Sequence, residues 1–161
     1  MKPLDRLDAR LLNLVQRNNR TSSEELAETV GLSATAVQRR LKRLRADGVI
    51  EADVSVIDPA SIGRALSMLL LVSMDRENAQ IVDRLKRAAR EAPEVMSAWF
   101  VTGEADFVLA VTVRDMADYE RFQREFLYRH ADVRDIRTLV VIDRVKAGFA
   151  LPIDENDYAK P

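Results

Sequence analysis

Two short amphipathic segments separated by one glycine restrict the fold of the first 50 residues more than any other feature. Gly31 stands between them, where a sharp exit from a helix needs a residue that tolerates positive φ. Ser33 follows as the cap of the next helix. The apolar positions that would hold the pair together are Leu26, Ala27, Val30, Leu32, Val37 and Leu41. A helix, a short glycine turn and a second helix predict a helix-turn-helix.

Capping signals predict where the helices of this region begin. Asp5, followed by Asp8, predicts the start of a first helix, in which negative charge suits the helix dipole. The second helix has two overlapping capping boxes, Thr21 with Glu24 and Ser22 with Glu25. The sequence alone does not choose between these two boxes.

The helix after Ser33 gathers positive charge on a chain whose formal net charge is −1. Residues 1–50 carry a balance of +4 and residues 51–161 a balance of −5, which suggests that one part of the chain meets a polyanion. A charge run on a helix is usually a solvated face, but an ordinary solvated face mixes signs and this helix contains no acid. Helical periodicity buries Ala34, Val37, Leu41 and Leu44 and turns Thr35, Arg39, Lys42 and Arg43 the other way.

This cationic face predicts binding to double-stranded DNA. A helix of this kind fits the major groove, where Arg reads guanine and Gln reads adenine. The predicted DNA-binding residues are Ser33 at the cap, Thr35, Gln38 and Arg39 for base contacts, and Arg40, Lys42 and Arg43 mainly for phosphate contacts.

The rest of the chain alternates between strand and helix patterns. Strand patterns cover 65–74, 95–102, 107–113 and 136–142, and helical patterns cover 78–91 and the segment after Asp115. The order βαββαβ predicts a ferredoxin-like domain, an antiparallel sheet with two helices on one face. Apolar residues occupy both alternating sets in several strands, so the other sheet face also needs cover. This pattern indicates that two sheets pair in a dimer.

The predicted fold class is therefore α+β, with a helix-turn-helix domain followed by a ferredoxin-like domain. Partial alternation over 49–57 predicts an extended strand that gives the first domain a winged-helix-like character. The predicted boundaries are 1–50 for the helix-turn-helix domain, 51–64 for the strand and linker, 65–148 for the ferredoxin-like domain and 149–161 for a C-terminal tail. We assign no function to the acidic tail.

Near its start the chain has Leu4, Asp5, Asp8, Leu11 and Leu12, and it continues with the stretches "EELAETVGLSATAVQRRLKRLRADGVI", "VTGEADFVLAV" and "VVIDRVK". Together they give the chain a resemblance, over nearly its full length, to the Lrp/AsnC family of transcriptional regulators. The resemblance implies a sequence-specific DNA-binding regulator whose assembly and operator affinity respond to a small molecule, usually an amino acid. It also implies homodimers that assemble into tetramers or octamers.

The resemblance places one wall of an effector site in the loop 102–106. The implied effector-binding residues are Thr102, Gly103, Glu104 and Asp106, with Thr138 contributed by a neighbouring subunit. Backbone N–H groups at Gly103 could receive a carboxylate and Asp106 could accept from an ammonium group. The residues by themselves also allow a plain hairpin turn at Gly103 that Asp106 caps. Glu104 either selects a cationic side chain or faces solvent.

Other function classes find little support in the sequence. An enzyme is not expected, because His130 is the single histidine in a polar stretch and no nucleophile, phosphate-loop or metal-ligand spacing occurs. The chain contains no Cys and no signal-peptide-like or membrane-spanning run, so we expect a cytoplasmic protein without a cofactor. Two alternatives stay open. One is an architectural, nucleoid-associated DNA-binding protein that needs no effector, and the other is a metabolite sensor that acts through the ferredoxin-like domain and binds DNA weakly.

Overall fold

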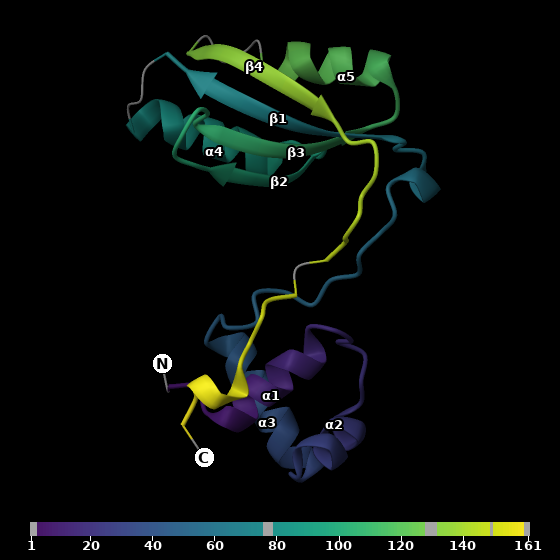
Figure 1. Ribbon diagram of the computed structural model, residues 1–161, viewed down its shortest axis with the longest axis vertical. Helices are drawn as coiled ribbons and strands as arrows, with labels where there is room; N and C mark the ends of the chain where they lie inside the picture. The colour runs from purple at the N-terminus through teal and green to yellow at the C-terminus, as the bar shows by residue number, and fades with distance from the viewer. Residues whose placement is uncertain (1–2, 76–78, 128–131, 149, 160–161) are drawn as a thin grey trace. The chain divides into compact units, whose positions relative to one another are not determined.

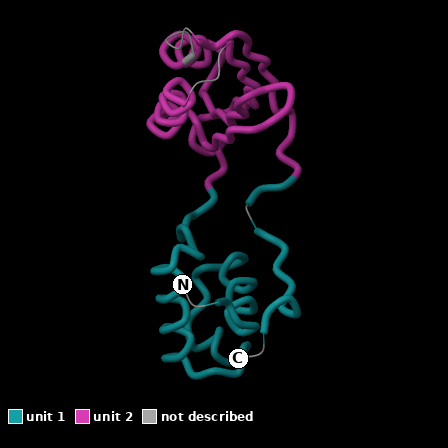
Figure 2. Tube along the Cα trace, turned by 90° about the vertical axis from the view of Figure 1, so that its left-hand side faces the viewer, with its two compact units in different colours: residues 1–56, 146–161 teal, residues 57–145 magenta. Residues whose placement is uncertain are grey.

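The computed structural model describes residues 3–75, 79–127, 132–148 and 150–159. His130 lies outside these described residues. Two compact units make up the chain, one containing 1–56 and 146–161 and the other containing 57–145 (Figure 2). We call them the helical unit and the sheet unit. The predicted tail is therefore part of the helical unit and not a separate extension.

Three capped helices form the core of the helical unit. They are α1 (Arg6–Val15), α2 (Ser23–Val30) and α3 (Ala34–Ala46) (Figure 1). The structure selects Ser22 with Glu25 as the capping box of α2. Gly31 ends α2 in the left-handed conformation, at φ 73°. The buried core of the unit consists of Leu11, Val15, Leu26, Ala27, Val30, Val37, Leu41 and Leu44.

The extended strand predicted over 49–57 is absent. Residues 51–58 have no regular secondary structure, and no segment of the described chain pairs with them as a strand. The side chains of Val54, Val56 and Ile57 are 66%, 57% and 56% exposed. Alternating apolar residues make a strand only where a second strand satisfies the backbone hydrogen bonds, so the winged-helix-like feature is not formed.

The sheet unit confirms the predicted ferredoxin-like order. Its elements are β1 (Leu66–Met74), α4 (Ala79–Glu91), β2 (Val95–Phe100), β3 (Phe107–Val113), α5 (Met116–Phe122) and β4 (Val133–Val140). A short 3-10 turn, Ala60–Ile62, precedes β1, and a π-helical turn, Gln123–Leu127, extends α5. The strands lie in the order β2-β3-β1-β4, and every pair is antiparallel.

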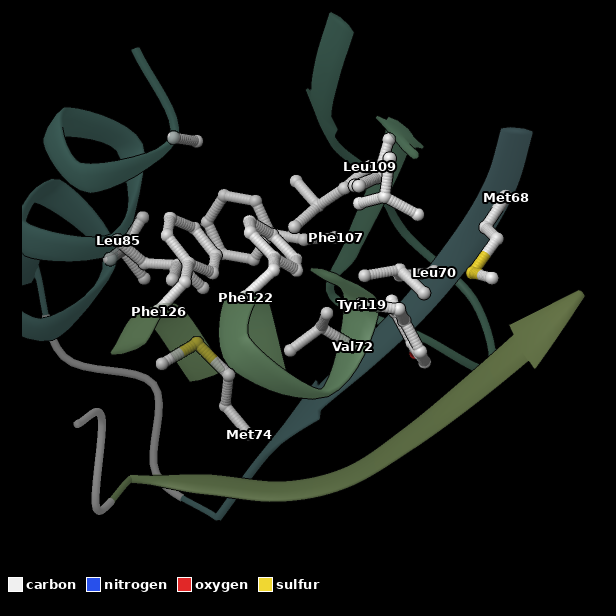
Figure 3. Close-up of a cluster of buried hydrophobic side chains, with 14 residues drawn as sticks. Met68, Leu70, Val72, Met74, Leu85, Phe107, Leu109, Tyr119, Phe122 and Phe126 are labelled. Carbon is white, nitrogen blue, oxygen red and sulfur yellow. The ribbon is translucent and has the colours of Figure 1, made fainter. Parts of the chain in front are cut away.

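One face of this sheet packs on both helices. Leu70 and Leu109 lie opposite each other in the β1–β3 register and are fully buried. Leu85 of α4 and Phe122 of α5 belong to the same buried cluster as these strand residues (Figure 3). Alternation along each strand then turns the intervening residues to the opposite face, which no described element of the sheet unit covers.

Candidate nucleic-acid interface and ligand loop

The position of α3 is fixed by its cap and by its apolar side. Ser33 accepts a hydrogen bond from the backbone N–H of Ala36, which satisfies one donor at the start of the helix. Val37 and Leu44 are fully buried against the other helices of the unit. These contacts determine which side chains of α3 remain on its outer side.

A row of four polar side chains occupies that outer side. Thr35, Gln38, Arg39 and Lys42 are all exposed. Within the described chain, none of the four forms an ion pair or a side-chain hydrogen bond with another residue. They stand at i, i+3, i+4 and i+7, so they share one face of the helix. We call these four residues the outer row.

Arg40 and Arg43 lie elsewhere, so the prediction that Arg43 faces outward with Arg39 is wrong. Nη1 of Arg40 lies 2.7 Å from Oδ2 of Asp5 and 2.8 Å from Oδ1 of Asp8. Nη2 of Arg43 lies 2.5 Å from Oδ2 of Asp8. Arginine has a long flexible stem, so its guanidinium can turn back towards α1 although its Cα lies on the flank of the buried face.

Asp8 is the centre of this ion-pair cluster. Its side chain is 0% exposed, which is unusual for a carboxylate without compensating partners. Burial alone would raise the pKa of Asp8, but hydrogen bonds from Arg43 and Arg40 outweigh it and hold that pKa below its usual value. The sequence suggested only a dipole role for Asp8. The available signal was the absence of any acid on α3, which leaves its cations to find partners on another helix.

The last cation of α3 is also paired. Nε and Nη2 of Arg45 donate to the two carboxylate oxygens of Asp53 at 2.7 and 3.2 Å. This two-point hydrogen bond raises the pKa of Arg45 above its usual value. The described part of α3 therefore presents Arg39 and Lys42 as its unpaired cations.

The loop between β2 and β3 holds the predicted effector residues. Thr102, Gly103 and Glu104 are exposed, and Gly103 has φ 127°, a conformation that side-chain-bearing residues rarely adopt. Asp106 points back into the fold, where its Oδ2 accepts from the backbone N–H of Met74 at 2.7 Å. This contact joins Asp106 to the end of β1 and not to the turn at Gly103.

The side chains of Thr138 and Glu104 differ in how accessible they are to a ligand. The hydroxyl of Thr138 lies 2.5 Å from the hydroxyl of Tyr119, on the helix-covered side of the sheet. Glu104 is highly exposed, and its Oε2 lies 3.6 Å from Nη2 of Arg137. The structure therefore brings Thr102, Gly103 and Glu104 to one surface and gives the side chains of Asp106 and Thr138 internal partners.

A C-terminal strap, residues 150–159, lies along α1 and was not foreseen from the sequence. Nδ2 of Asn13 donates to the carbonyl of Ile153 at 3.0 Å. Gln16 exchanges two hydrogen bonds with the backbone of Leu151, at 2.9 and 2.8 Å. The backbone N–H of Arg6 donates to the carbonyl of Ala159 at 2.9 Å. All four of these bonds use the strap backbone, which leaves no signature in side-chain patterns.

Two features are absent from the described residues: a metal-binding cluster and a membrane-spanning helix. These residues contain no group of three or more His, Cys, Asp or Glu side chains placed to hold a metal ion. None of their helices is both long and apolar enough to cross a membrane.

Comparison with known proteins identifies a family domain in each half of the chain. Residues 4–45 match the AsnC-type helix-turn-helix domain, and residues 67–151 match the Lrp/AsnC ligand binding domain. An HTH-type transcriptional regulator of Sinorhizobium fredii is 58% identical over 151 residues, which cover 94% of this chain and 89% of that protein. The leucine-responsive regulatory protein of Escherichia coli is 32% identical over 94% of this chain and 93% of its own length.

A solved structure extends the comparison to three dimensions. A transcriptional regulator of Neisseria meningitidis, crystallised as a complex with L-Met, superposes with a TM-score of 0.86 at 30% identity. The match covers 96% of this chain and 99% of that one. The two domain matches, the 58% identical relative and the shared fold lead to one conclusion. This chain belongs to the Lrp/AsnC family of DNA-binding transcriptional regulators.

Proposed function

We propose that the protein reads operator DNA with the outer row of α3, pairs with a second copy through the open face of its sheet, and changes its operator affinity when an amino acid binds at the loop 102–106. The observation that carries the proposal is the outer row itself. Four donor-bearing side chains lie exposed on one helix face, and none has a partner within the described residues. A DNA-binding regulator acts where the chromosome lies, so we place the protein in the cytoplasm.

Within the outer row, Arg39 and Lys42 have different roles in the proposal. Arg39 reads a base edge together with Thr35 and Gln38, and Lys42 contacts phosphate. Replacing Arg39 with Gln should cost ~1–3 kcal/mol on the preferred sequence and little on other DNA. Replacing Lys42 with Gln should weaken binding to all sequences and reduce the salt slope by about one unit. Arg84→Gln, an exposed arginine of α4, is the matched control.

The assay needs DNA that the protein itself chooses. A duplex selected by the wild-type protein from a random library would be compared with a scrambled duplex, by fluorescence anisotropy over a salt series. Equal losses on both duplexes for Arg39→Gln would contradict the base-reading role. Protection of a few phased sites in footprinting would support a regulator, whereas even coverage would support the architectural alternative.

The open face of the sheet supports pairing with a second copy. Leu69, Trp99 and Leu139 point to this face and are 36%, 47% and 47% exposed. An apolar face of this kind usually marks an interface. Leu139→Glu should shift the protein towards monomer in sedimentation velocity. Met116→Glu is the control, because Met116 is 60% exposed but lies at the start of α5. Equal assembly of both variants would refute this interface.

The exposed part of the loop 102–106 supports an amino-acid site. Backbone N–H groups near Gly103 suit a carboxylate, and the exposed Glu104 suits an ammonium group. The side chains of Asp106 and Thr138 form hydrogen bonds within the fold, so in this proposal they shape the site and do not contact the ligand directly. The L-Met complex of the Neisseria meningitidis regulator supports an amino acid as the ligand class.

A titration tests the loop. Trp99 lies three residues before Thr102, so its fluorescence should report binding across a panel of amino acids. Gly103→Val should abolish the response, and Gly63→Val should retain it, because both glycines have positive φ but only Gly103 lies in the loop. Couplings of this kind change DNA affinity ~5- to 150-fold. If operator affinity and assembly were the same with every amino acid, the sensing role would be refuted.

A further inference from the structure

We propose that Asp8 is a positioning residue that determines sequence specificity, because it holds Arg40 and Arg43 away from DNA and sets the rotation of α3. The inference rests on the proposed DNA-reading role of the outer row. It adds a second class of residue to that role, since Asp8 lies on α1 and touches no DNA in the proposal.

The geometry makes Asp8 a bridge between two side chains of one helix. Its Oδ1 accepts from Arg40 and its Oδ2 from Arg43, at 2.8 and 2.5 Å. Residues three apart on a helix lie side by side, so one carboxylate on α1 grips α3 at two neighbouring points. Asp5 adds a second acceptor for Arg40 at 2.7 Å and accepts from the backbone N–H of Asp8 at 2.9 Å.

A two-point grip restricts rotation of α3 about its own axis. Apolar contacts through Val37 and Leu44 determine which side of α3 is buried, but the hydrophobic driving force is itself non-directional and adds no specific bond against smaller rotations. Charge-assisted hydrogen bonds are directional, and a fully buried carboxylate that loses its partners is strongly penalised. Rotation that would turn the outer row away from a groove must therefore break bonds to Asp8.

The same grip removes two cations from the DNA-facing charge. A free arginine at position 40 or 43 would add a phosphate contact, and phosphate contacts do not discriminate between sequences. Asp8 thus lowers affinity for all DNA and leaves recognition to the outer row. Loss of Asp8 should raise binding to random DNA through the freed arginines and lower discrimination through rotation of the outer row, whereas loss of a phosphate contact weakens binding to all DNA.

The test measures the full-length protein on the selected and scrambled duplexes, over a salt series. Asp8→Asn should steepen the salt slope on scrambled DNA by about one unit per freed guanidinium. It should also reduce the ratio of the two affinities, by ~10-fold if one base contact is misaligned. A proportional loss on both duplexes with an unchanged slope would overturn the proposal.

Variants on α3 keep the inference testable even if Asp8→Asn fails to fold. Arg43→Gln should leave the salt slope of scrambled DNA unchanged, whereas Lys42→Gln should lower it by about one unit. If both variants lower the slope equally, Arg43 contacts phosphate and the inference is wrong. If Lys42→Gln has no effect, the outer row itself is not the DNA face, so the two failures are distinguishable. Adding Arg40→Gln and Arg43→Gln to Asp8→Asn should restore the wild-type slope.

Discussion

Removal of the C-terminal strap should destabilise the helical unit and leave the stability of the sheet unit unchanged. A chain that ends after residue 149 loses the bonds from Asn13 to Ile153, the two between Gln16 and Leu151, and the one from Arg6 to Ala159. Four hydrogen bonds at a net ~0.5–1.5 kcal/mol each give about 2–6 kcal/mol. Water competes for the exposed Gln16 bonds, and release of the strap returns conformational entropy. We therefore expect a loss of ~2 kcal/mol, near the lower bound.

Differential scanning calorimetry measures this loss. For a unit of this size, ~2 kcal/mol corresponds to a fall of about 8–16 °C in the midpoint of thermal unfolding. Leu44→Ala and Leu85→Ala identify the transitions of the helical and sheet units, because each removes a fully buried side chain from one core. The control is Asn13→Ala with Gln16→Ala, which removes three of the bonds and keeps the strap. If the truncated chain unfolds at the same temperature as the full chain, the strap contacts do not stabilise α1.

Three further measurements address the helical unit. Acid should destabilise the helical unit through Asp8, because the pKa of Asp8 is lower in the folded chain than in the unfolded chain. The ion pairs of Asp8 therefore contribute their full stability above a pH of about 4, the usual pKa of an aspartate. This stability is lost as the pH falls through the folded pKa. Urea midpoints measured at several pH values should show this loss. If the urea midpoint of Asp8→Asn depended on pH as steeply as that of the wild type, the role of Asp8 would be contradicted. Gly31→Ala should cost ~1–2 kcal/mol because φ is 73°, and an unchanged urea midpoint would refute the need for glycine. Leu44→Ala should lower the free energy of unfolding by ~2–5 kcal/mol in the same assay. If it lowered that free energy no more than an alanine substitution at an exposed position does, the place of Leu44 in the core would be contradicted.

Local patterns were sufficient for most of the fold. Asp5, Ser22 and Ser33 each cap a helix through a contact within four residues, so their sequence signals are complete in themselves. The βαββαβ order also follows from local periodicity, and the antiparallel sheet confirms it. The choice between two capping boxes at α2 needed the structure, since Thr21 and Ser22 offer the same chemistry one residue apart.

Contacts distant in sequence account for what could not be predicted. Asp8 and Arg40 are separated by 32 residues, and no periodicity links them. The strap binds α1 through backbone carbonyls, which every residue carries. The alternation at Val54 and Val56 predicted a strand that has no partner in the described chain, because alternation reports a possible face and not a second strand. The loop at Gly103 was predicted as a turn, but the inward direction of Asp106 depended on where β1 ends.

The ion pairs of α3 change how its charge relates to DNA recognition. If all five cations of α3 faced a duplex, sequence-independent phosphate contacts would supply a larger share of the binding free energy. In the described structure Arg40, Arg43 and Arg45 are neutralised by aspartates, while Arg39 and Lys42 are not. Each good base contact contributes ~1–3 kcal/mol of discrimination, and this contribution is the same whether or not extra phosphate contacts are added. Withdrawing cations from the interface therefore lowers the affinity for operator and random DNA alike, and the ratio of the two affinities depends on the outer row.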